Sequence, residues 1–259
     1  MINLQKQDGF TLVELLIGLL ISLLVISGAL ALLLKVFEGQ KSNLGLIRLN
    51  EETRFLSELM IKDIRRAGFV STYADDDFDS LYNNPFFSEV SGSSTDITIF
   101  DDSDYDSAIS LGAAGECILL SYNADNDQAV VVDNNERMGY RLNNGVLQIR
   151  TEGATNESCN NGTWYDLSNP RVNVTSLTFT QSNDDFDVTT MIDGSGDDDS
   201  DGVCEVGEAC TTCASGSSCL LVRTIDLSMT IELASDSSLQ QTFSETVRIR
   251  NDKFIESYP

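Results

Sequence analysis

The chain has 259 residues, enough for a membrane segment and one sizeable soluble domain or two small ones, with a formal net charge of −25 and no histidine. Without histidine, Ser-His-Asp and Cys-His catalytic sites and His-ligated zinc sites are excluded, so we do not expect an enzyme. The negative charge lies after residue 68, where the sequence has eight Lys and Arg and 34 Asp and Glu, a net charge of −26. An acidic domain of this kind attracts cations. It offers no basic patch to phosphates, which argues against nucleic acid as a partner.

An uncharged apolar run, Leu15 to Leu34, follows the hexapeptide Gly9-Phe10-Thr11-Leu12-Val13-Glu14. As a helix, twenty residues rise about 30 Å, which matches the hydrocarbon core of a bilayer. No proline interrupts the run, so the helix need not break. The run therefore predicts a membrane-spanning helix near the N-terminus.

Glu14 is the charged residue at the N-terminal edge of this run. A lone carboxylate at such a depth is unfavourable and calls for a partner. If the chain is cut after Gly9, the new N-terminus at Phe10 is an ammonium one helical turn away from Glu14. A neighbouring subunit would present the same pair, so an amine–carboxylate contact between subunits would satisfy both charges.

The hexapeptide and the apolar run resemble the class III leader junction of type IV pilins and of the pseudopilins of type II secretion. In that family a prepilin peptidase cuts after the glycine and methylates the new phenylalanine. The resemblance implies cleavage after Gly9, N-methylation of Phe10 and Glu14 as the assembly carboxylate. It also implies a leader peptide (1–9), a transmembrane and assembly helix (10–34), an amphipathic half of the same helix (35–68) and an exported β-rich domain (69–259). The leader departs from the positive-inside rule, because Asp8 offsets Lys6.

Two other interpretations of the N-terminus are open. An ordinary secretory signal peptide would be cut after its apolar region, and Ala29-Leu30-Ala31 offers a small-residue site for that. A signal anchor with an incidental Glu14 would keep the whole segment.

The segment from Arg48 to Arg66 predicts an amphipathic helix, with Gly39 and Gly45 as weak points before it and Gly68 as its stop. Apolar residues recur at spacings of three and four, at Phe55, Leu56, Leu59, Met60, Ile64 and Ala67. The charged residues are expected on the other side, at Glu51, Glu52, Glu58, Lys62, Asp63, Arg65 and Arg66. The stretch 55–69 resembles the end of this helix in PilW-type minor pilins and, more loosely, in J-type minor pseudopilins.

After a polar linker at 71–95, period-two alternation predicts a β-rich domain. Asn143-Asn144-Gly145 predicts a tight hairpin, and its flanks, Tyr140-Arg141-Leu142 and Leu147 to Arg150, also resemble the PilW-type family. The expected fold is α+β and pilin-like: a long N-terminal helix packed on a C-terminal β-sheet domain with disulfide-bonded loops. The expected strands are 97–100, 117–122, 129–132, 137–142, 146–150, 172–181, 220–233 and 242–250.

An acidic loop at 197–208 fits the EF-hand pattern D-x-[DN]-x-[DN]-G-x5-E. Calcium prefers six to eight oxygen ligands, and alternating carboxylates can converge on one ion around the turn at Gly202. The predicted calcium ligands are Asp197, Asp199, Asp201, the Val203 carbonyl, Glu205 and Glu208. Neither flank of the loop has a helical pattern, so the predicted site is an EF-hand-like calcium loop without the two helices. The alternative is a solvated acidic turn that binds no metal.

Six cysteines, Cys117, Cys159, Cys204, Cys210, Cys213 and Cys219, all lie in the part that would be exported. An even count in an oxidising compartment predicts disulfides, although fifteen pairings of six cysteines are possible. If the last four pair among themselves, Cys117 and Cys159 remain for each other. A zinc knuckle or a Cys-x2-Cys redox centre at the last four is the alternative.

The resemblance implies a minor subunit of the type IV pilus, PilW-like, that helps to prime assembly; a place in the tip complex of the filament is a further expectation. Its implied partners are other minor pilins, the major pilin, the prepilin peptidase and the inner membrane. The implied location is single-pass in the inner membrane with a periplasmic domain, and then in the extracellular pilus. The alternatives are a type II secretion minor pseudopilin and a calcium-dependent membrane-anchored adhesin.

Overall fold

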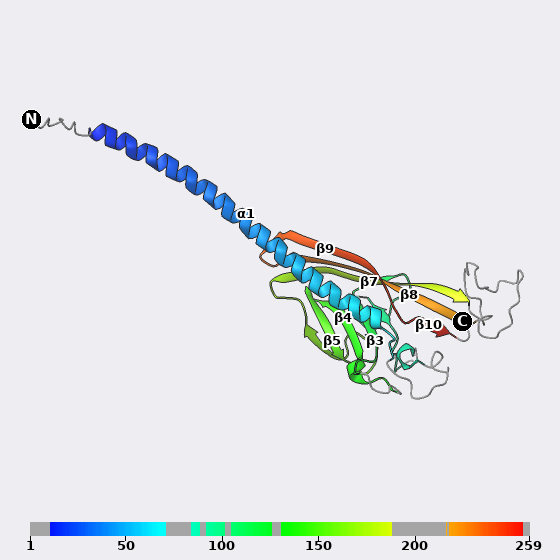
Figure 1. The fold of residues 1–259 in the computed structure, drawn as a ribbon. Coiled ribbons are helices and arrows are strands. Elements are labelled where there is room, and N and C mark those ends of the chain that lie inside the picture. Colours follow the sequence, from blue (N-terminus) through cyan, green and yellow to red (C-terminus); the bar gives the residue numbers. More distant parts are fainter. Residues whose placement is uncertain are drawn as a thin grey trace, which may run out of the picture. The chain divides into compact units, whose positions relative to one another are not determined.

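The computed structural model describes residues 11–70, 84–88, 92–101, 105–125, 131–187, 216 and 218–255. The chain divides into two compact units, Met1–Arg48 and Leu49–Pro259. Helix α1 (Leu12–Arg66) is a single element that supplies the described part of the first unit and the first residues of the second (Figure 1).

In the first unit, α1 is long and apolar enough to span a membrane, with a mean hydropathy of 2.7 over its most apolar window, none of which is buried. The large apolar side chains from Leu12 to Leu34 are exposed. The helix passes through Gly39 and Gly45 without a break, so these expected weak points do not interrupt it. Such a surface is unfavourable in water and is suited to lipid or to other helices.

The first sheet of the second unit is antiparallel, in the order β1-β3-β4-β5-β6. Its strands are β1 (Thr98–Phe100), β3 (Cys117–Ser121), β4 (Arg137–Asn143), β5 (Val146–Glu152) and β6 (Thr163–Asp166). Asn144 and Gly145 both have positive φ, 51° and 80°, which the two-residue turn between β4 and β5 requires. The predicted hairpin is confirmed.

The second sheet has the order β10-β8-β7-β2, and β9 also pairs with β8. Its strands are β2 (Ala114–Gly115), β7 (Val172–Asp187), β8 (Cys219–Leu233), β9 (Asp236–Arg248) and β10 (Lys253–Ile255). β9 and β10 pair with successive parts of β8, so they follow each other along one side of that strand. Two short 3-10 turns, η2 (Pro85–Phe87) and η3 (Asn134–Glu136), lie in the connections.

The strand predictions differ from the structure at several ends. β7 and β9 are longer than expected, because pairing along β8 extends them through polar residues that carry no apolar alternation. The expected strand at 129–132 is wrong over its described residues: Val131 and Val132 lie outside any strand, and Val131 is 72% exposed. Strands β2, β6 and β10 have two to four residues, too few to show a period.

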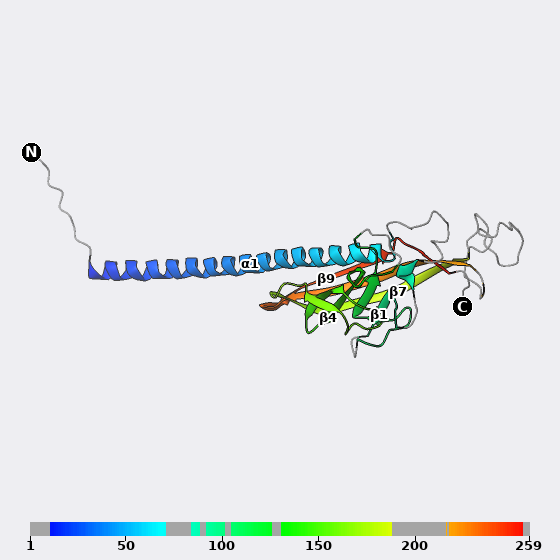
Figure 2. The ribbon, with the colours of Figure 1, turned by 90° about the horizontal axis from the view of Figure 1, so that it is seen from below.

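The core of the second unit forms where the last turns of α1 cover the strands, as Figures 1 and 2 both show. The helix contributes Leu49, Leu56, Met60 and Ile64, and Ala67 follows directly after it; all five are fully buried. β8 contributes every second residue from Ile225 to Leu233 and leaves the others half-buried or exposed. The predicted α+β arrangement, a long helix packed on antiparallel sheets, is confirmed.

Two helix residues lie on a different side from the one predicted. Phe55 is 56% exposed, whereas Asp63, expected in solvent, is only 7% exposed. Asp63 is three residues after Met60 and four before Ala67, so it belongs to the buried stripe of the helix.

The end of α1 is fixed by residues from several parts of the sequence. Gly68 has a φ of 73° and donates its N–H to the Ser121 carbonyl at 2.8 Å. Asn84 donates to the Gly68 carbonyl at 2.8 Å, and Asn251 donates to the Ala67 carbonyl at 3.0 Å. A Cβ atom at Gly68 would lie 1.9 Å from the ring of Phe87. Only glycine fits there, and Gly68 stops the helix as the sequence predicts.

Candidate functional site

Glu14 lies at the start of α1 in a reciprocal cap with Thr11. The Thr11 N–H and hydroxyl donate to Glu14 Oε2 at 3.1 and 3.0 Å, and the Glu14 N–H donates to Thr11 Oγ1 at 3.3 Å. This is a capping box, which satisfies backbone donors that the first helical turn leaves free. The carboxylate therefore has a local partner within the chain and is still exposed at the helix end.

Several predicted site residues lie outside the described residues. These are Gly9, Phe10, the whole of the loop 197–208 with its predicted calcium ligands, and Cys204, Cys210 and Cys213. Among the residues that are described, no group of three or more Asp, Glu, Cys or His side chains is placed to hold a metal ion. The calcium site and the cleavage site stay predictions from the sequence.

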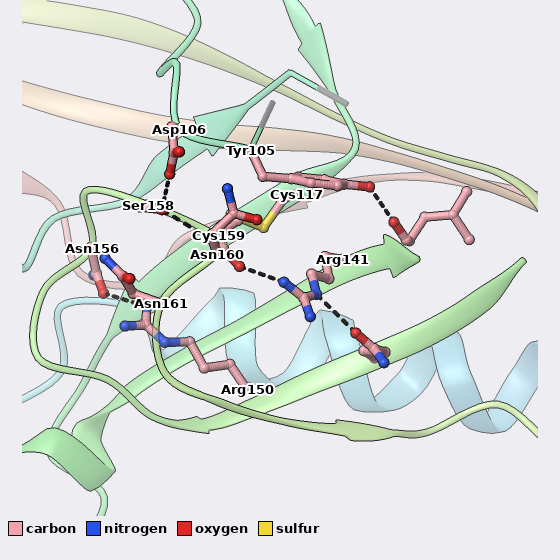
Figure 3. Close-up of a disulfide and its surroundings, with 12 residues drawn as sticks. Tyr105, Asp106, Cys117, Arg141, Arg150, Asn156, Ser158, Cys159, Asn160 and Asn161 are labelled. Atoms are coloured by element: carbon pink, nitrogen blue, oxygen red, sulfur yellow. Dashed lines mark hydrogen bonds between the residues drawn. A yellow bond between two sulfur atoms is a disulfide. The ribbon is translucent and has the colours of Figure 1, made fainter. Parts of the chain in front are cut away.

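A disulfide joins Cys117 of β3 to Cys159, which lies in the connection between β5 and β6 (Figure 3). The two residues are 42 apart in sequence, and both are fully buried. Cys219 is also disulfide-bonded, so it is not a ligand of the zinc knuckle considered above. Among the fifteen pairings that the sequence leaves open, the structure has the one that joins Cys117 to Cys159.

Arg141 holds the same connection from the neighbouring strand. Its Nη1 donates to the Cys159 carbonyl at 2.6 Å, and its Nε donates to Gln148 Oε1 at 2.8 Å. Its guanidinium also stacks on the Trp164 ring, 4.2 Å from the centroid. Figure 3 shows this side chain reaching from β4 toward the disulfide. Arg141, the middle residue of the Tyr140-Arg141-Leu142 segment of β4, thus fixes this loop.

Arg150, near the end of β5, also fixes the connection between β5 and β6. It is fully buried, and its Nη2 donates to the Thr155 carbonyl at 2.6 Å. Burial, together with the nearby charge of Arg137, lowers the pKa of Arg150 to about 10. Gly153 leaves room for it, since a Cβ there would lie 1.5 Å from Arg150 Nη2. The side chain shapes the loop between β5 and β6 from inside.

A buried carboxylate links α1 to the first sheet. Asp63 accepts hydrogen bonds from the phenol groups of Tyr122 and Tyr140, at 3.1 and 2.5 Å. Burial and the Asp63 charge raise the pKa of both phenols, so both stay protonated and donate at neutral pH. Arg66 stacks over Tyr122 at 4.3 Å from the ring centroid. These contacts set the rotation of the helix on the strands.

A second buried carboxylate, Asp96, links the two sheets. It precedes β1 and accepts from Arg223 of β8 at 2.6 Å and from Lys253 of β10 at 2.7 Å. Burial alone would raise the pKa of Asp96, but the two cations outweigh burial and hold that pKa below its usual value. Asn156 donates to the Thr95 and Asp96 carbonyls and to Ser121 Oγ, which ties in the disulfide loop.

Sequence reasoning missed both carboxylate centres. Their signals are modest: Asp63 falls in a 3-4 spaced apolar stripe, and Arg223 falls two residues before Ile225, at an inward position of an alternating strand. Nothing in the short segments around Asp96 and Lys253 shows that they would meet.

The chain matches known families over most of its length. Residues 4–30, which include Gly9, Phe10 and Glu14, match the family described as the prokaryotic N-terminal methylation motif. Residues 42–249, well over half of the chain, match the family described as prepilin peptidase-dependent protein B. Comparison with curated proteins and with solved structures gave no match. The chain is thus pilin-like with a prepilin-type N-terminus, and it belongs to the prepilin peptidase-dependent protein B family.

Proposed function

We propose that this protein is a minor pilin of the type IV pilus, similar to the PilW type, that takes part in priming filament assembly. The observation that carries the proposal is the exposed apolar half of α1, in which Glu14 is the only charge up to Leu34. A helix of this kind is stable only in lipid or among similar helices. The methylation-motif match over 4–30 supports the same role.

In the proposed mechanism, the prepilin peptidase removes residues 1–9 and Phe10 becomes a methylated ammonium. Helices of neighbouring subunits then pack through residues 10–34. Glu14 fixes the register by meeting the N-terminus of a neighbour, and this contact has to compete with its local cap on Thr11. The β-rich domain selects the partner subunits, which are other minor pilins and the major pilin.

Deletion of the gene tests the proposal against its nearest competitor, a minor pseudopilin of type II secretion. The proposal predicts a loss of surface pili that the wild-type gene restores, with secretion of folded exoproteins unchanged. Pili would be counted by electron microscopy, and secreted protein by activity in the culture supernatant. Normal pili together with a loss of secretion would contradict the proposal and would favour a minor pseudopilin.

We also propose that the loop 197–208 binds calcium through Asp197, Asp199, Asp201, Val203, Glu205 and Glu208. The support is the sequence pattern: alternating carboxylates, a glycine at the turn and a closing glutamate, which together suit a hard cation.

Calcium should stabilise the folded protein, since a ligand at a hundredfold excess over its Kd contributes about 2.7 kcal/mol. Chelation is therefore expected to lower the melting temperature of the full chain in detergent micelles, and added calcium should restore it. The variant Asp199→Asn/Glu208→Gln should be insensitive to both treatments. An identical melting temperature of the wild-type chain with and without chelator would contradict the calcium proposal.

A further inference from the structure

A groove of about 440 Å³ lies between the last turns of α1 and the end of β9, within the second unit. It is lined by Glu58, Ile61, Lys62, Arg65, Arg66, Glu245 and Arg250. We call it the basic groove, because four of these seven side chains are cations. Its volume falls in the range of about 300–1,000 Å³ that is usual for ligand pockets.

The carboxylates of the basic groove are already paired. Glu58 accepts from Arg54 at 2.7 Å, and Glu245 accepts from Arg65 at 3.2 Å. Three positive charges remain in the groove without a carboxylate partner in the described part of the chain, those of Lys62, Arg66 and Arg250.

These three cations also have donors available for a ligand. Within the described ranges, the side chains of Lys62 and Arg250 make no hydrogen bond or ion pair, and both residues are exposed. Arg66 stacks on Tyr122 and is half-buried. The groove therefore presents uncompensated positive charge to solvent.

This charge stands out against the rest of the exported sequence. Four of the eight Lys and Arg after residue 68 are buried, namely Arg137, Arg150, Arg223 and Lys253. The expectation from the sequence that there is no basic patch is wrong here. The charge count is made separately for residues before and after Gly68, whereas the groove combines cations from both parts. Helix residues from before Gly68 meet Arg250, whose N–H donates to the Arg65 carbonyl at 3.1 Å.

We propose that the basic groove binds a short carboxylate-rich segment of a neighbouring pilin-type subunit. Lys62, Arg65 and Arg66 are spaced i, i+3 and i+4, so they form one stripe along the helix beside Arg250. Guanidinium groups recognise carboxylates through paired hydrogen bonds, which gives geometric specificity as well as attraction.

Charge complementarity selects a short acidic segment of a protein as the occupant. A long polyanion would extend beyond the groove and meet the rest of a chain whose net charge after residue 68 is −26, and it would be repelled. A neighbouring subunit that presents carboxylates would make a contact between two different surfaces, and contacts of that type can continue along a filament. The choice of a pilin-type neighbour rests on the proposed function.

The test uses the full chain in detergent micelles and a fluorescein-labelled peptide of eight glutamates as the probe. Binding measured by anisotropy at low ionic strength should weaken at least about tenfold in Lys62→Glu/Arg250→Glu. The matched control is Arg171→Glu/Arg248→Glu, which changes the net charge equally at exposed positions outside the groove and should bind as the wild type does. The milder Lys62→Gln/Arg250→Gln, checked by its melt, guards against misfolding of the first variant. Equal affinity of the wild type and both groove variants, or equal loss in groove and control variants, would overturn the proposal.

A second arm identifies the neighbour. A photo-crosslinking amino acid placed at position 62 in cells should join the chain to another pilin-type subunit, and the product would be identified by mass spectrometry. Crosslinks only to lipid, or to proteins that are not pilin-like, would overturn the choice of occupant. The peptide experiment does not depend on pili, so its failure would contradict binding at the basic groove. Normal pili after deletion of the gene would contradict the proposed function.

Discussion

Replacement of Glu14 by alanine is expected to abolish incorporation of the protein into filaments while its β-rich domain stays folded. The reason is electrostatic: without the carboxylate, the ammonium of a neighbouring Phe10 would be buried among apolar helices with no counter-charge. Breaking a buried ion pair by removing one partner costs about 3–5 kcal/mol, which is ample to prevent recruitment. The measurement is an immunoblot of sheared surface filaments, normalised to the amount of protein in the membrane fraction.

The cap between Thr11 and Glu14 provides the controls. Glu14→Gln can keep the hydrogen bond to the Thr11 N–H, because glutamine also completes a capping box, but it lacks the charge. Thr11→Ala keeps the charge and loses the hydroxyl cap, worth about 1 kcal/mol. We expect Glu14→Gln to fail like Glu14→Ala, and Thr11→Ala to assemble nearly as the wild type. Normal incorporation of Glu14→Gln would show that helix capping, not charge, is what assembly requires.

Replacement of Asp96 by alanine is expected to have the largest effect on folding. Arg223 and Lys253 are then both buried without a counter-ion, which should lower the free energy of unfolding by about 3–5 kcal/mol. Unfolding of the full chain in micelles by denaturant would measure this. The control is Arg248→Ala, which breaks the exposed Arg248–Asp252 pair and should change stability by less than about 1 kcal/mol. Equal effects of the two variants would contradict the structural role of Asp96.

The same centre predicts a dependence on pH. The pKa of Asp96 is lower in the folded protein than in the unfolded chain. The ionised carboxylate therefore stabilises the folded state, and this contribution is fully present above the pKa of an unfolded aspartate, about 4. That contribution is lost as the pH falls through the lowered folded pKa. The wild type should therefore lose more stability than Asp96→Asn on acidification below about pH 4. Parallel acid titrations of the two proteins would contradict the assignment.

The sequence predicts the parts of this protein that depend on local signals. The uninterrupted apolar run gives the exposed half of α1, Gly68 gives the end of the helix, and Asn144-Gly145 gives the hairpin between β4 and β5. Each of these follows from the conformational preference or the solvation of a few consecutive residues.

Features that depend on distant pairing could not be predicted in this way. Asp96, Arg223 and Lys253 are far apart in sequence, and only the fold brings them together. The same is true of the basic groove, where helix residues meet Arg250. The charge of Asp63 predicts exposure to solvent, whereas the two phenol donors make its burial favourable.

The way in which α1 ends has a mechanical consequence if the protein is a filament subunit, as proposed. Gly68 bonds to Ser121, Phe69 bonds to Asn123, and side chains of Asn84 and Asn251 hold the last carbonyls of the helix. Together with the carboxylate–phenol contacts of Asp63, these bonds attach the end of the helix to several separate parts of the chain. Rupture should then require several attachments to give way at once, so the junction should resist tension better than any one of them would.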